Sequence, residues 1–125
     1  MKTVVTSPEL PPPVGPFSPA IATDGWIFLS GQGGFDPASG SMISDDVAEQ
    51  TAQTFRNIKA LLSAAGAGLA DVVSCLVHLV DLDDYPQFNQ IYAAQFPDAQ
   101  PVRTTVRADL VAGMRVEITV IARKV

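Results

Sequence analysis

The feature of this sequence that most constrains its fold is a change of hydrophobic period along residues 45–124. Apolar and small residues recur every three or four positions over residues 45–65 and again over 83–96, which predicts two helices. The segments 71–80, 103–109 and 115–124 alternate with a period of two and predict strands, as does "GWIFLSGQ" at residues 25–32. This order predicts an α+β fold: a single mixed sheet with two helices packed on one face.

Local signals define the ends and faces of these elements. Asp46 and Glu49 have the spacing of a capping box at the start of the first helix, and Gly66 is suited to end it. In the segment 71–80, we expect the core face to carry the odd-numbered residues Val73, Cys75, Val77 and Leu79. In the last strand, we expect the even-numbered residues 116–122 to lie beneath the helices, which places Glu117 on the opposite face.

The composition limits the classes of protein to which this sequence can belong. The 125 residues fit one domain, 1–125, and 47% of them are apolar, which is enough for a substantial core. The net charge of −5 and the lack of a basic run argue against nucleic acid as a partner. Cys75 is the single cysteine, a pattern typical of a reducing cytoplasm. We expect neither a secretion signal nor a membrane span, because the sequence has no long apolar run.

Two charges in the C-terminal segment "PVRTTVRADLVAGMRVEIT" are candidates for a site. Arg103 and Glu117 are expected on adjacent strands joined by a turn at Gly113. They form either a structural ion pair or the two working groups of a site, and Arg115 is another partner available to Glu117. The second sheet face, with Leu76 and Ile121, is too apolar for bulk water, so we expect subunits to pack there and a site to use groups from two chains.

Seven segments occur in an order that resembles a known family. They are "GPFSPA" (15–20), "LSGQ" (29–32), "DPASG" (36–40), "EQTAQTFRNIKALLSAAG" (49–66), "FNQIYAAQF" (88–96), "PVRTTV" (101–106) and "VEITVIA" (116–122). Together they cover nearly the whole chain and are similar to the RidA/YjgF family of enamine/imine deaminases. The resemblance implies a chorismate-mutase-like fold, a homotrimer and a cleft at each subunit interface.

The resemblance also implies roles for individual residues. Arg103 clamps the substrate carboxylate, and Glu117 positions the attacking water. Phe17 and Thr105 depart from the family pattern, since they stand where a tyrosine and a cysteine are usual. The substrate-binding positions that the resemblance implies besides Arg103 are Ser30, Gly31, Phe17, Asn89 and Thr105.

The implied reaction is hydrolysis of a reactive 2-imino acid, or of its 2-aminoacrylate-type enamine, to a 2-oxo acid and ammonia. A guanidinium matches a carboxylate bidentately, and a nearby carboxylate can accept a proton from water. We expect no cofactor, and no metal, because His78 is the only histidine and a packed or interface position suits it better than a ligand role. Two other functions stay open: a non-catalytic trimer that binds small carboxylates or acts as a chaperone, and, less favoured by the charge, an endoribonuclease.

Overall fold

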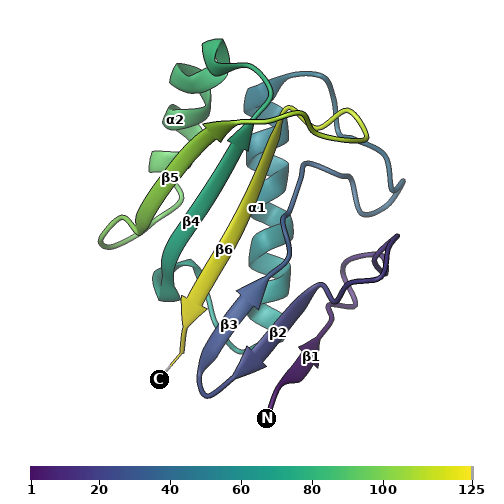
Figure 1. Cartoon of the computed structure of the whole chain (residues 1–125), viewed down its shortest axis with the longest axis vertical. Coiled ribbons are helices and arrows are strands. Elements are labelled where there is room, and N and C mark those ends of the chain that lie inside the picture. The colour runs from purple at the N-terminus through teal and green to yellow at the C-terminus, as the bar shows by residue number, and fades with distance from the viewer. Residues whose placement is uncertain (125) are drawn as a thin grey trace.

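Six strands form one sheet in the order β1-β2-β3-β6-β4-β5 in the computed structural model, which describes residues 1–124 (Figure 1). The strands are β1 (Thr3–Val5), β2 (Ala20–Thr23), β3 (Trp26–Leu29), β4 (Val72–Leu79), β5 (Val102–Arg107) and β6 (Val116–Arg123). The helices are α1 (Val47–Ala64) and α2 (Tyr85–Ala93), with short 3-10 turns at Leu69–Asp71 and Leu82–Asp84. Both helices cover the same face of the sheet. The predicted α+β fold is therefore confirmed.

One strand pair makes the sheet mixed. β4 pairs parallel with β5, whereas its other neighbour, β6, is antiparallel to it. The parallel pair follows from the connection, since α2 crosses over the sheet between β4 and β5. β5 is consequently an edge strand, and β4 lies between it and β6. The expectation that the strands carrying Arg103 and Glu117 are adjacent is wrong.

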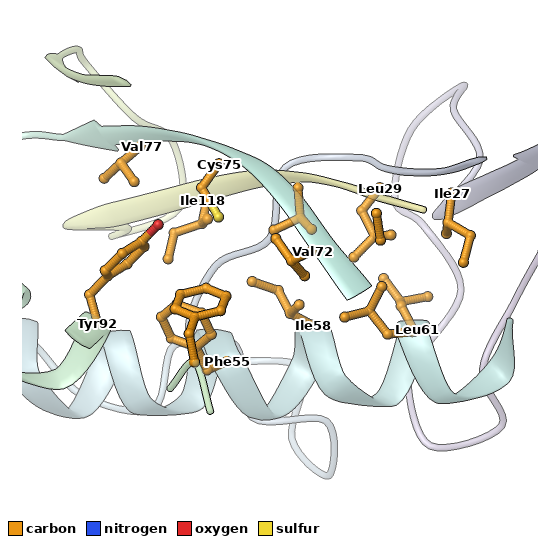
Figure 2. Close-up of a cluster of buried hydrophobic side chains, with 14 of the residues drawn as sticks. Ile27, Leu29, Phe55, Ile58, Leu61, Val72, Cys75, Val77, Tyr92 and Ile118 are labelled. Carbon is orange, nitrogen blue, oxygen red and sulfur yellow. The ribbon is translucent and has the colours of Figure 1, made fainter. Parts of the chain in front are cut away.

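The first helix begins and ends where its sequence signals predict. Asp46 is the N-cap, and its Oδ2 accepts a hydrogen bond of 2.9 Å from the Glu49 backbone N–H. Gly66 follows the helix with φ +78°, a left-handed conformation that glycine adopts at little cost. Phe55, Ile58 and Leu61 point from α1 toward the sheet in Figure 2 and are almost completely buried.

The core lies between the helices and one face of the sheet. The even-numbered residues of β6, from Val116 to Ala122, are buried there, as predicted. β4 departs from the prediction at its start: an irregularity in its pairing with β6 falls between Val72 and Ser74. The shift turns Val72 into the core and leaves Val73 40% exposed, so Val73 does not belong to the core face.

The opposite face of the sheet is not covered by either helix. The strand register places large apolar side chains of β3, β4 and β5 on this face, the same face as Ile121 and Glu117 of β6. Those that are exposed are Trp26, Phe28, Leu76, Val102 and Val106. A sheet face with this much exposed apolar surface is typical of a contact surface for another protein.

Candidate functional site

Arg103 lies on the helix-covered side of edge strand β5. It is the register partner of Cys75, which is buried beneath the helices, and side chains of paired residues project from the same face of a sheet. The guanidinium carbon lies 4.7 Å from the centre of the Tyr92 ring and 5.4 Å from that of Tyr85. These two rings of α2 pack against the flat face of the guanidinium group and leave the N–H groups at its edge free for hydrogen bonding.

Two side chains of α2 orient the guanidinium group within its plane. Arg103 Nη1 donates to Asn89 Oδ1 at 2.9 Å, and Nη2 donates to Tyr85 Oη at 2.6 Å. Neither partner carries a negative charge, and Arg103 forms no ion pair within the described residues 1–124. The ion-pair alternative for Arg103 is therefore wrong within one chain, and its positive charge is available to an anion.

A shallow depression opens beside this arginine. It has a volume of about 480 Å³ and is lined by Leu82, Tyr85, Arg103 and Thr105. Thr105 is the register partner of the buried Val77, so it projects from the same side of β5 as Arg103. Its hydroxyl oxygen is buried and has no hydrogen-bond partner within residues 1–124. The sequence-predicted residues Arg103, Asn89 and Thr105 thus lie together.

Glu117 lies on the other face of the sheet. It is paired in register with His78, and its Oε1 is 3.8 Å from His78 Nδ1. Both side chains are about one-quarter exposed. Arg115 does not pair with Glu117 but with Asp84 and Asp45, at 3.0 and 3.6 Å, so that alternative is also wrong. Glu117 is consequently free of any cationic arginine or lysine in the described chain.

The segment that follows β3 lies alongside Glu117. Gly31 approaches so closely that a Cβ at this position would be 2.7 Å from Glu117 Cδ. Ser30 also contacts the loop that precedes β2, because its Oγ donates to the Ser18 carbonyl at 2.7 Å. Phe17 belongs to that loop and is exposed. The sequence-predicted residues Ser30 and Gly31 therefore accompany Glu117, not Arg103.

The candidate residues form two groups on opposite faces of the sheet. We call Arg103, Asn89 and Thr105 the cationic half-site, and Glu117, Gly31 and Ser30 the acidic half-site. β4 lies between the strands that carry Arg103 and Glu117. Its Cys75 pairs with Arg103 on the helix-covered face, and its His78 pairs with Glu117 on the uncovered face. The two charges cannot contact one small ligand within a single copy of this sheet.

Sequence reasoning missed the hydroxyl of Tyr85 and assigned His78 only a packed or interface position. Tyr85 is 18 residues from Arg103, and only the packing of α2 against β5 brings them together. Tyr85 continues the apolar face of α2, since it precedes Phe88 by three residues and Tyr92 by seven, but this pattern does not reveal that the face meets Arg103 of β5. His78 was placed correctly on the face of Glu117 by the alternation of β4, but the strand order was needed to pair them.

Buried groups behind the cationic half-site are held neutral. Burial raises the pKa of the Cys75 thiol, and nearby Arg103 lowers it to a smaller extent. Burial likewise raises the pKa of Tyr92. Neither group is prepared to act as an anion, so the chemistry rests with the more exposed residues.

Within residues 1–124, no three side chains of His, Cys, Asp or Glu are grouped so as to hold a metal ion. No helix in this part of the chain has the length and apolar character required to cross a membrane.

The fold and the two half-sites define a small α+β protein with an arginine on one face of the sheet and a carboxylate on the other. The chain matches the family model described as "Endoribonuclease L-PSP" over residues 8–124, and it belongs to this family, which includes the Rid/YjgF proteins. The family suggested by the sequence resemblance is thereby confirmed.

Individual relatives are similar over their full length. A RutC family protein of Pyrococcus horikoshii is 38% identical, with 99% of both chains covered. The 2-iminobutanoate/2-iminopropanoate deaminase of Homo sapiens is 37% identical, with 98% of this chain and 90% of the relative covered. The crystal structure of E. coli TdcF with bound serine has a TM-score of 0.92 at 26% identity, with 98% and 99% of the two chains covered.

Proposed function

We propose that this protein hydrolyses reactive 2-imino acids, or their enamine tautomers of the 2-aminoacrylate type, to 2-oxo acids and ammonia. The observation that carries the proposal is an arginine held by neutral partners on one face of the sheet, with a glutamate on the other face that has no arginine or lysine partner and lies beside His78. The name of the human deaminase relative and the serine bound to E. coli TdcF support a small amino-acid-derived carboxylate as the ligand.

In this proposal, the active site forms between two copies of the chain in a homotrimer. The cationic half-site of one copy faces the acidic half-site of its neighbour, which brings together charges that one copy separates. The exposed apolar side chains around Glu117, among them Phe28 and Leu76, support subunit packing on this face. Sedimentation equilibrium at micromolar concentration is expected to give a trimer, and a monomer would contradict the proposed assembly.

The reaction divides between the two half-sites. Arg103 holds the carboxylate of the substrate through paired N–H donors, which fixes the imine carbon in place. Ser30, Gly31, Asn89, Phe17 and Thr105 are the further substrate-binding positions of the proposal. The binding step thus orients a planar substrate before any proton moves.

Proton transfer is the role proposed for Glu117. Its carboxylate accepts a proton from water as the water oxygen attacks the imine carbon, giving a tetrahedral carbinolamine. The same proton passes to the nitrogen, which completes the neutral carbinolamine. The carbinolamine hydroxyl then gives its proton to the nitrogen, through Glu117, as the carbon–nitrogen bond breaks, the carbonyl forms and ammonia leaves. One water is consumed for each ammonia released, and Glu117 returns to its starting state.

One assay tests the proposed function. A serine dehydratase generates 2-aminoacrylate in situ, and pyruvate formation is followed with and without the protein. We expect faster pyruvate formation with the protein and a ~10²-fold lower rate of acceleration with the Glu117→Gln variant. Tight pyruvate binding without acceleration would show a carboxylate-binding protein that lacks catalysis. Cleavage of RNA in place of deamination would favour the activity in the family description.

A further inference from the structure

Tyr85 places a hydroxyl at the edge of the Arg103 guanidinium. Its side chain is 39% exposed, and its Oη accepts the 2.6 Å hydrogen bond from Arg103 Nη2. Tyr92, the other tyrosine of the chain, differs in being only 4% exposed. Tyr85 is therefore the tyrosine whose hydroxyl a ligand in the depression can reach.

The hydrogen bonds around Arg103 leave donors unused. A guanidinium carries five N–H donors, and Asn89 and Tyr85 accept one each, which leaves three. The Tyr85 oxygen accepts in this contact, so its own O–H hydrogen stays available, and it donates to no group within residues 1–124. Accepting from a cation polarises the phenol and makes it a stronger donor.

The free O–H and the free N–H groups open on the same space. Tyr85 and Arg103 both line the depression of about 480 Å³, and Leu82 supplies an apolar wall. A carboxylate seated on the guanidinium edge lies within reach of Tyr85 Oη, because that oxygen is 2.6 Å from Nη2. One carboxylate oxygen can then accept from both groups.

We propose that the Tyr85 hydroxyl is a substrate ligand that donates a third hydrogen bond to the carboxylate held by Arg103. The ligand class, 2-oxo and 2-imino carboxylates, rests on the proposed function. The role assigned to Tyr85 is direct contact with the ligand, in addition to its contact with Arg103.

The test measures pyruvate binding by calorimetry, which requires no turnover. Tyr85→Phe removes one hydroxyl and keeps the ring, and the Kd is expected to rise about tenfold, as for one hydrogen bond to a charged group. Ser63→Ala is the control, because it removes an exposed hydroxyl at the end of α1 that does not line the depression, and it should leave the Kd unchanged. An unchanged Kd in Tyr85→Phe would overturn the inference.

A second variant separates direct contact from support of the arginine. In an Arg103→Lys background, the penalty of Tyr85→Phe persists if the hydroxyl touches the ligand. Loss of that penalty would overturn the inference, because Tyr85 would then act only through the guanidinium.

The outcomes also separate this inference from the proposed function. A tenfold loss of affinity in a protein that does not deaminate would retain the ligand role and refute the enzyme. Deamination with an unchanged Kd in Tyr85→Phe would refute only the ligand role. Failure of the unmodified protein to bind pyruvate would refute the ligand role as stated.

Discussion

Replacing Gly31 by alanine should displace the carboxylate of Glu117 without removing it. The added Cβ would lie 2.7 Å from Glu117 Cδ and 2.8 Å from Oε2. Non-bonded carbons normally approach to about 3.5–4.0 Å, so the carboxylate must move by roughly 1 Å. Gly31 is not among the residues with positive φ, so the backbone itself accepts alanine.

The expected result is a loss of activity in a stable protein. The displaced atoms belong to the end of a flexible side chain, and the free energy of unfolding should change by less than about 1 kcal/mol. A misplacement of about 1 Å in a catalytic group lowers the rate ~10²-fold, so kcat in the dehydratase-coupled assay should fall by that factor. Thermal unfolding followed by circular dichroism reports the stability of the same sample.

A glycine without neighbours supplies the control for this substitution. Gly68 has φ −146°, and a Cβ there meets no atom within 4 Å. Gly68→Ala should therefore retain full kcat. If Gly31→Ala keeps both its stability and its kcat, the contact between Gly31 and Glu117 has no part in catalysis, and the role of Glu117 as the base would be refuted.

Three more substitutions test the other parts of the account. Arg103→Lys should weaken pyruvate binding by ~1–3 kcal/mol in calorimetry, because lysine lacks the paired donors, and an unchanged Kd would place the anion elsewhere. Glu117→Gln should lower kcat ~10²-fold with little change in KM; a raised KM with intact kcat would indicate a binding role instead. Gln50 is fully buried and its amide bonds three backbone groups, so Gln50→Leu should lower the free energy of unfolding by ~1–3 kcal/mol; an unchanged urea midpoint would contradict this.

The sequence predicted those parts of the fold that depend on local signals. Asp46 and Gly66 mark the ends of α1 because capping involves residues within one turn of each other. The strict alternation of β6 placed Glu117 on the uncovered face, since a strand with one buried face allows only one assignment. β1 and β2 were not predicted, because three- and four-residue strands are too short for a clear period.

The arrangement of the site depended on contacts that sequence patterns do not encode. Arg103 and Glu117 were expected side by side because the chain runs directly from one strand to the next. In the sheet, β4 instead lies between them, because β4 pairs with both β5 and β6 through contacts that are distant in the sequence. The irregularity at Val73 and the contact of Tyr85 with Arg103 are tertiary features of the same kind.

The central claim is that a working site combines Arg103 of one copy with Glu117 of another. Its most direct test mixes two inactive variants, Arg103→Met and Glu117→Gln, by denaturing them together and refolding. Random assembly gives both intact groups in about a quarter of the clefts between subunits, so the account predicts recovery of roughly that share of the activity. A refolded mixture of trimers as inactive as either variant alone would contradict it.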